Sequence, residues 1–160
     1  MSTLQNKNTQ IEFIAGNNEF SLIYQQRLIL RHTAQAPCLW IGGGEADIDM
    51  FRGNFSIKDR LNEKVALTDV KITAQPAGWH LHFSRGDTLS ATLVITTDDS
   101  GRLQLNLQND NRAHNRIWLR LAAQPQDHIY GCGEQFSYFD LRGKPFPLWT
   151  SEQGVGRNKQ

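Results

Sequence analysis

Apolar and polar residues alternate with a period of two along most of the chain before residue 122. In segment 79–83, for example, Trp79, Leu81 and Phe83 alternate with two histidines. Successive side chains of a β-strand point to opposite faces of its sheet, so this alternation predicts strands with one buried face. The other strands predicted in this way are segments 20–24, 28–32, 38–41, 70–74, 89–96, 103–107 and 117–121.

Turn-forming residues separate the predicted strands. Examples are Asn17-Asn18, Pro76-Ala77-Gly78 and the segment from Asp98 to Gly101. Glycine, proline, asparagine and aspartate favour the backbone conformations of tight turns. About ten short strands separated by such turns are typical of an all-β fold. We therefore predict an antiparallel two-layer β-sandwich.

Two segments are expected to interrupt the strands. Gly42-Gly43-Gly44 follows strand 38–41 and is predicted to be a flexible turn, because the spacing required of a dinucleotide-binding loop is not present. Lys58–Val65 is predicted to form a turn of helix. Ser56 could cap it, and acidic residues lie toward its start.

Composition and charge narrow the possible partners. The 160 residues include 17 Lys and Arg against 16 Asp and Glu, so no net field attracts nucleic acid or an anionic membrane. The N-terminus has no signal-peptide pattern, and no apolar run approaches the roughly 20 residues of a membrane span. We expect a cytoplasmic chain. Its two cysteines, Cys38 and Cys132, are expected to be reduced thiols.

The segment 129–160 breaks the pattern of alternation and is called the Gly/aromatic region. Glycines and prolines punctuate it, and between them lie Tyr130, Phe136, Tyr138, Phe139 and Trp149. Aromatic side chains on turns present ring faces that suit sugars. We therefore predict two parts, a β-sandwich domain over residues 1–128 and the Gly/aromatic region over residues 129–160.

Several groups of reactive side chains have simpler explanations than a metal or catalytic site. Acidic residues Glu45, Asp47 and Asp49 would share one solvent-facing side of a strand, without the loop glycine and carbonyls that calcium needs. His80 and His82 lie on the polar face opposite Trp79, with no further zinc ligands at the usual spacing. No metal or cofactor is predicted.

Two more groups lie in or beside the Gly/aromatic region. Cys132 between glycines has only His128 nearby as a possible base, so a thiol nucleophile is not predicted. Glu134 and Asp140 are carboxylates among the aromatics, but a six-residue loop gives a catalytic pair no rigid support. We predict no catalytic residue in this chain.

The order Tyr-Gly-x-Gly-Glu at residues 130–134 resembles a signature of glycoside hydrolase family 31, where it closes a β-rich N-terminal region. The longer run from Glu134 to Gly143, followed by Glu152-Gln153-Gly154-Val155-Gly156-Arg157, resembles the sulfoquinovosidase branch of that family. Segments 38–41 and 47–55 are also similar, so the resemblance covers nearly the whole chain.

The resemblance implies a mutarotase-like sandwich that precedes a catalytic (β/α)8 barrel in a retaining α-glycosidase. Both catalytic aspartates of the family lie on the barrel, which needs roughly 250 residues and does not fit in this chain. We expect the chain to be truncated before the barrel and inactive alone. Its expected partners are that barrel and a sugar substrate, an α-glycoside that carries a sulfonate in the sulfoquinovosidase branch.

The resemblance also implies a small set of substrate-binding residues. In the family, the Gly-Glu segment at residues 133–134 and the loop after it reach over the mouth of the barrel. Glu134, Gln135 and Phe136 could therefore touch the sugar. The alternative is that Glu134 accepts backbone amides and Phe136 packs at a domain interface. Arg142 could bind a sulfonate. However, the sulfonate ligands of the branch belong to the barrel, which favours pairing of Arg142 with a neighbouring carboxylate.

Two other functions are compatible with the sequence. A stand-alone carbohydrate-binding sandwich would use Phe136, Tyr138 and Trp149 as a platform. A mutarotase-like epimerase would need a His and Glu acid–base pair in a cleft. We favour neither over the domain of a larger glycosidase.

Overall fold

The computed structural model describes residues 2–6, 9–51, 54–109, 111–131 and 138–144. Eleven strands lie in these residues: β1 (Ser2–Asn6), β2 (Thr9–Gly16), β3 (Glu19–Tyr24), β4 (Arg27–His32), β5 (Leu39–Phe51), β6 (Asn54–Ala66), β7 (Asp69–Gln75), β8 (Gly78–Arg85), β9 (Leu89–Thr97), β10 (Leu103–Gln108) and β11 (Arg116–Leu119). The described part of the chain contains no helix long and apolar enough to cross a membrane.

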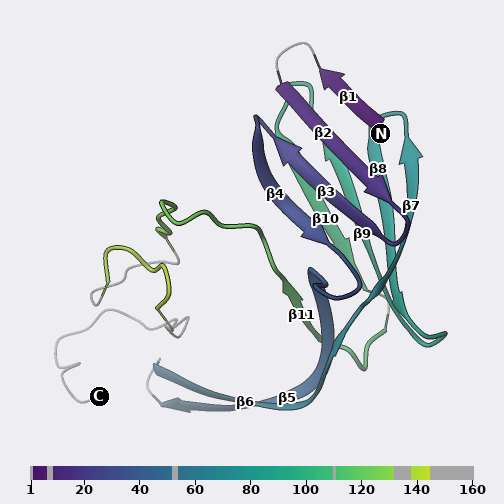
Figure 1. Cartoon of the computed structure of the whole chain (residues 1–160). Coiled ribbons are helices and arrows are strands. Elements are labelled where there is room, and N and C mark those ends of the chain that lie inside the picture. Colours follow the sequence, from purple (N-terminus) through teal and green to yellow (C-terminus); the bar gives the residue numbers. More distant parts are fainter. Residues whose placement is uncertain (1, 7–8, 52–53, 110, 132–137, 145–160) are drawn as a thin grey trace. The chain divides into compact units, whose positions relative to one another are not determined.

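The strands form two four-stranded antiparallel sheets and one three-stranded sheet. The first sheet has the order β1-β2-β3-β4, and the second has the order β10-β9-β8-β7 (Figure 1). Strand β11 pairs with β5, which also neighbours β6 in the third sheet. The predicted all-β antiparallel fold is confirmed.

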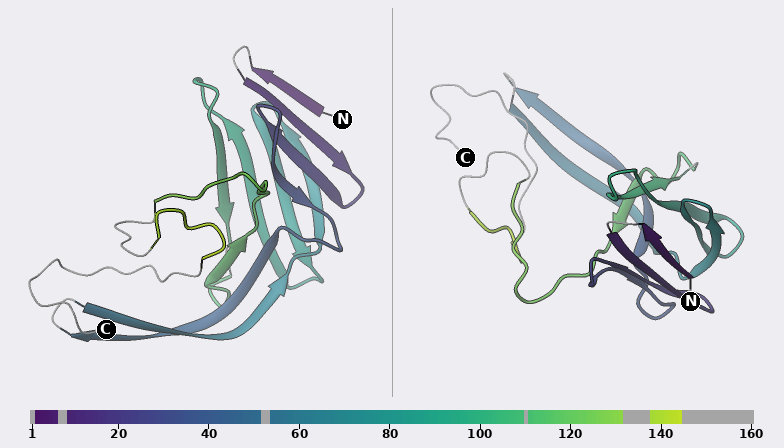
Figure 2. Two further views of the ribbon diagram at one scale, coloured as in Figure 1. Left: turned by 60° about the vertical axis from the view of Figure 1, so that its left-hand side comes forward. Right: turned by 90° about the horizontal axis from the view of Figure 1, so that it is seen from above.

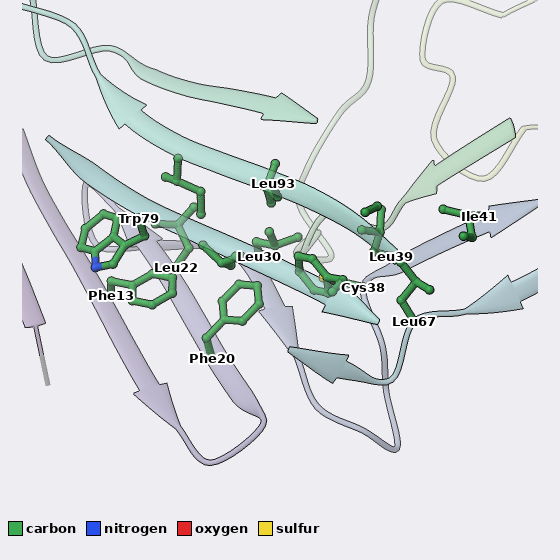
Figure 3. Close-up of a cluster of buried hydrophobic side chains, with 14 of the residues drawn as sticks. Phe13, Phe20, Leu22, Leu30, Cys38, Leu39, Ile41, Leu67, Trp79 and Leu93 are labelled. Atoms are coloured by element: carbon green, nitrogen blue, oxygen red, sulfur yellow. The ribbon is translucent and has the colours of Figure 1, made fainter. Parts of the chain in front are cut away.

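A buried apolar core joins the two four-stranded sheets into the predicted sandwich. Phe13 of β2 stacks on Trp79 of β8, with ring centroids 4.6 Å apart. Phe20 of β3 meets Phe83 of β8 edge to face at 6.0 Å. Figure 3 shows Phe13, Phe20 and Trp79 together with Leu22, Leu30 and Leu93. Burial of one such side chain contributes about 1.5–3 kcal/mol, so the alternating faces read from the sequence account for the core.

Hairpin turns set the register of the first sheet. Asn18, between β2 and β3, has φ of 59°, and Gln25 and Gln26, between β3 and β4, have φ of 49° and 62°. Two successive residues with positive φ are characteristic of the type I′ turn, whose twist matches that of paired strands. Asn18 also accepts the backbone N–H of Val70 at 2.6 Å and so ties this sheet to β7.

The prediction of a turn at Gly42-Gly43-Gly44 was wrong, because β5 continues through all three glycines. A Cβ on Gly42 would lie 2.3 Å from the carbonyl oxygen of Glu63 and 2.9 Å from the Trp118 ring. A Cβ on Gly43 would lie 2.7 Å from the carbonyl oxygen of Ala113. Gly42 and Gly43 therefore permit close packing against β5, and the three glycines do not form a turn between two strands.

The prediction of a helical turn at Lys58–Val65 was also wrong, because this segment lies within β6. Its apolar residues Ile57, Leu61 and Val65 recur every four positions, a spacing that places them on one face of either a helix or a strand. Pairing with β5 decides between the two. Figure 2 shows β5 and β6 running side by side.

The chain divides into two compact units that do not follow sequence order. The first unit contains Met1–Gly44 and Leu61–Ala122, and the second contains Glu45–Arg60 and Ala123–Gln160. The core described above belongs to the first unit. The functional boundary predicted between residues 128 and 129 stays a prediction.

Candidate functional site

The predicted sugar-binding residues Glu134, Gln135 and Phe136 lie at 132–137, outside the described residues. Cys132 and Trp149 also lie outside them. The structure describes the segments on either side, 123–131 and 138–144. These two segments form the base of a loop, residues 130–139, which we call the aromatic loop.

The carboxylate of Asp140 holds the two ends of the aromatic loop together. Its Oδ1 accepts the backbone N–H of Ile129 at 3.0 Å and that of Arg142 at 3.0 Å. The N–H of Leu141 donates to the carbonyl of Ile129 at 2.8 Å, and the Leu141 side chain is buried. The two described ends of the loop therefore meet, and these hydrogen bonds fix its base.

The local sequence explains this base. Aspartate commonly accepts the backbone N–H two residues later, which is the bond between Asp140 and Arg142. Gly143 and Gly131 have φ of 65° and 105°, a region that side chains rarely adopt. The sequence Asp-Leu-Arg-Gly therefore begins a turn in which Asp140 bonds to Arg142, and the same carboxylate oxygen accepts the N–H of Ile129.

The guanidinium of Arg142 contacts the same base. Its Nη1 donates to the carbonyl oxygen of Asp127 at 2.8 Å and to that of Gln124. Within the described residues these carbonyls take the place of the carboxylate partner that the sequence led us to favour. Both bonds use the same one of the three guanidinium nitrogens, Nη1. The predicted contact of Arg142 with substrate stays a prediction.

His128 completes the hydrogen bonds of Asp140. Its Nδ1 lies 2.7 Å from Asp140 Oδ2. Bonds from the N–H groups of Ile129 and Arg142, together with His128, lower the pKa of Asp140 to about 2. The carboxylate is therefore ionised at neutral pH and can only accept hydrogen bonds. It follows that His128 Nδ1 carries a proton.

Aromatic rings at the ends of the loop are exposed. Tyr130 is 57% exposed and Phe139 is 89% exposed, and their ring centroids lie 5.2 Å apart. The ammonium of Lys144 lies 5.2 Å from the centroid of the Tyr138 ring, the distance of a cation–π contact. Large exposed apolar surface on a loop often marks a binding site.

The other candidate groups lie where the sequence predicts. Glu45, Asp47 and Asp49 are exposed on β5, and Asp47 pairs with Arg60 of β6 at 3.1 Å. His82 is exposed, with Nδ1 3.4 Å from the Thr92 hydroxyl on the neighbouring strand, as expected for a cross-strand pair. No group of three or more potential metal ligands occurs among residues that the structure describes.

Two buried histidines were not predicted. His32 Nε2 lies 3.2 Å from the carbonyl oxygen of Thr68, and its Nδ1 accepts the N–H of Cys38. His114 Nε2 lies 2.9 Å from Glu63 Oε1, but His114 is only 7% exposed. A sugar cannot reach a ring at that depth, so this His and Glu pair does not provide the acid–base pair of an epimerase. It connects β6 to the segment before β11.

The hydrogen bond between His128 and Asp140 is the feature of this site that the sequence did not predict. From the sequence, Asp140 is a possible partner only of Glu134, and His128 is a possible base only for Cys132. The two residues are twelve positions apart on an irregular segment, where no periodicity indicates which side chains meet. The available signal was the Asp-Leu-Arg-Gly turn.

An antiparallel sandwich followed by a glycine-rich aromatic loop defines the class of this domain. The chain belongs to the glycosyl hydrolase 31 N-terminal galactose mutarotase-like domain family, whose model matches residues 46–160. Among its relatives is a sulfoquinovosidase from Escherichia coli, 69% identical over 160 residues, which are all of this chain and 24% of the relative. A sulfoquinovosidase from Agrobacterium fabrum is 38% identical over 93% of this chain and 21% of its own length.

A solved structure is similar over the same region. A GH31 family sulfoquinovosidase from E. rectale, in complex with the aza-sugar inhibitor IFGSQ, matches 92% of this chain and 21% of its own. The TM-score is 0.75 and the sequence identity is 34%. The family resemblance seen in the sequence is confirmed. The chain spans about a quarter of the length of the curated relatives it matches.

Proposed function

We propose that this chain is the N-terminal domain of a retaining α-glycosidase that hydrolyses α-sulfoquinovosides, and that its aromatic loop completes the substrate pocket. The observation that carries this proposal is the 69% identity to a sulfoquinovosidase along the whole of the chain. Because the chain matches only 24% of that relative, catalysis is assigned to the intact enzyme. The cytoplasmic location stays a prediction.

The loop would serve by position and not by acid–base chemistry. A retaining glycosidase places two carboxyl groups about 5–5.5 Å apart across the scissile bond. The described carboxylate nearest the loop, Asp140, is already committed to two backbone amides and His128. An acid with a pKa of about 2 is a poor proton donor at neutral pH. We therefore assign neither the acid nor the nucleophile to this chain.

Preorganisation is what the base of the loop contributes to binding. A loop that is held in its bound conformation loses less conformational entropy when substrate arrives. With its base fixed by Asp140, the loop would present Glu134, Gln135 and Phe136 to the sugar. A carboxylate accepts hydrogen bonds from vicinal hydroxyls, and an aromatic ring covers the apolar face of a pyranose.

A chimera tests this proposal. The segment of the E. coli relative that matches this chain is replaced by residues 1–160, and hydrolysis of 4-nitrophenyl α-sulfoquinovoside is measured. We expect activity within about tenfold of the parent, and a Glu134→Ala chimera with a KM raised by roughly 10- to 100-fold, the loss of one hydrogen bond to a charged group. The control is Glu45→Ala, which removes an exposed carboxylate on β5. An unchanged KM in Glu134→Ala would contradict the role of the loop.

A further inference from the structure

His128 has one ring nitrogen committed and a ring open to solvent. Nδ1 lies 2.7 Å from Asp140 Oδ2, while the side chain is 61% exposed. Asp140 is held in turn by the N–H groups of Ile129 and Arg142, so it cannot turn away without opening the loop base. The imidazole is thus oriented by a carboxylate that is itself fixed.

This arrangement selects one tautomer of His128. The ionised carboxylate of Asp140 accepts a hydrogen bond from the N–H at Nδ1, so in the neutral ring Nε2 carries a lone pair and acts as an acceptor. Carboxylates that bond to one nitrogen of an imidazole orient the ring for use of the other nitrogen in many metal and catalytic sites.

Two aromatic rings extend from His128. The His128 ring and the Tyr130 ring are nearly parallel, at 22° and 6.1 Å between centroids. The Tyr130 ring meets the Phe139 ring at 5.2 Å. The three rings form a row with one polar nitrogen acceptor at one end and apolar faces along the rest.

We propose that His128, Tyr130 and Phe139 form a carbohydrate-binding subsite at the base of the aromatic loop. Nε2 of His128 accepts a hydrogen bond from a sugar hydroxyl, and the exposed Phe139 ring covers the apolar C–H face of the same sugar. The Tyr130 ring, whose plane is tilted 57° from that of Phe139, contacts the edge of the sugar. A pyranose combines one apolar face with a rim of hydroxyl donors, which is the pattern this row complements. The assignment of the sugar as part of an α-glycoside rests on the proposed function.

Two substitutions of His128 separate binding from structure. In His128→Asn the side-chain amide occupies the place of Nδ1 and can still donate to Asp140, but the group at Nε2 is lost. In His128→Gln the longer amide reaches the place of Nε2 and offers an oxygen acceptor, but the bond to Asp140 is lost. A ring that only secures the loop base would make Gln the more damaging change, and a ring that binds sugar would make Asn the more damaging one.

The kinetic test uses the chimera described above. We expect His128→Asn to raise KM about fivefold, as for loss of one neutral hydrogen bond, while His128→Gln raises it less than twofold. Phe139→Ala is expected to raise KM by a similar or larger factor through loss of the ring face. The control is His80→Asn, an exposed histidine on β8. A His128→Asn chimera no weaker than the His128→Gln chimera overturns the proposal.

A binding test on the 160-residue chain keeps the subsite separate from the proposed function. If the chimera is inactive, the glycosidase assignment fails, and the chain itself is titrated with methyl α-glucoside to about 100 mM while the ring resonances are followed by NMR. We expect the His128, Tyr130 and Phe139 rings to shift together, with the His80 ring unchanged. Unchanged ring signals from these three residues would overturn the subsite, as would shifts that persist in His128→Asn and Phe139→Ala variants.

Discussion

The sandwich core and the base of the aromatic loop are held by different forces. In the core, fully buried side chains such as Leu81 and Phe83 hold the sheets together through contact area. At the loop base, the exposed His128 and the partly buried Asp140 are held by hydrogen bonds of 2.7–3.0 Å. The first arrangement resists unfolding, and the second fixes the direction of polar groups that face solvent. Substitutions in the two regions should therefore affect different measurements.

The largest effect is expected from a cavity in the core. Leu81 is fully buried on β8, opposite Ile72 on β7 and Leu93 on β9. We expect Leu81→Ala to lower the free energy of unfolding by about 2–5 kcal/mol, measured by chemical denaturation. The matched control is Leu61→Ala on β6, which removes the same atoms from a largely exposed side chain and should cost less than about 0.5 kcal/mol. Equal losses of unfolding free energy in Leu81→Ala and Leu61→Ala would contradict the placement of Leu81 in the core.

A smaller loss of stability is expected at Gly42. A methyl group there would lie 2.3 Å from the carbonyl oxygen of Glu63, which belongs to a neighbouring strand and cannot rotate away. We expect Gly42→Ala to lower the free energy of unfolding by about 1–3 kcal/mol through overpacking. A free energy of unfolding equal to that of the parent, measured by thermal or chemical denaturation, would contradict the close approach of β6 to β5.

Removal of Asp140 should leave the unfolding of the sandwich unchanged and alter only the loop base. In Asp140→Ala, the backbone N–H groups of Ile129 and Arg142 lose their acceptor. We expect faster hydrogen exchange at these two amides and no change at the amides of β8. In both proteins the β8 amides should exchange more slowly than the amides of the loop base. Faster exchange at β8 in the variant than in the parent would show that Asp140 also stabilises the sandwich and would contradict this prediction.

The same base should respond to acid in a defined direction. The folded pKa of Asp140, about 2, lies below the value of about 3.9 for an unfolded aspartate. Its contribution to the stability of the loop base is therefore present above pH about 4 and is lost as pH falls through about 2. We expect the amide resonances of Ile129 and Arg142 to titrate with a midpoint near the folded value. A midpoint near 4 would contradict the hydrogen bonds assigned to the carboxylate.

The smallest effect is expected at Cys38, whose thiol should not react in the folded chain. Burial raises its pKa to about 12, so the thiolate that alkylating reagents attack is scarce at pH 8.5. In a Cys132→Ser chain, we expect iodoacetamide to label Cys38 only after denaturation. The raised pKa also means that stability falls as pH rises above the unfolded thiol's value of about 8.5. Rapid labelling of folded protein would contradict burial of the thiol.

The comparison of the two regions also explains what the sequence could predict. The inward residues of β8, Trp79, Leu81 and Phe83, follow from alternation alone, because each strand of a sandwich repeats one local rule. The roles of Gly42 and Gly43 in β5 do not follow from alternation, because they depend on the approach of Glu63, Ala113 and Trp118 from elsewhere in the sequence. Local rules read such glycines as a turn.

The loop base was harder to predict for a related reason. The hydrogen bond between His128 and Asp140 depends on the backbone path of an irregular segment, and such a path produces no periodic pattern in the sequence. The resemblance in the sequence identified the loop and its family, and the family is confirmed. The parts assigned to Glu134, Gln135 and Phe136 stay predictions.

The central claim is that this domain shapes a pocket whose reactive acids lie in another part of the enzyme. The most direct test compares turnover of 4-nitrophenyl α-sulfoquinovoside by the 160-residue chain and by the chimera at equal concentration. The account predicts no turnover above buffer for the chain alone and turnover within about tenfold of the parent enzyme for the chimera. Turnover by the chain alone that disappears in Glu134→Ala would contradict it, because the acid would then lie in the loop itself.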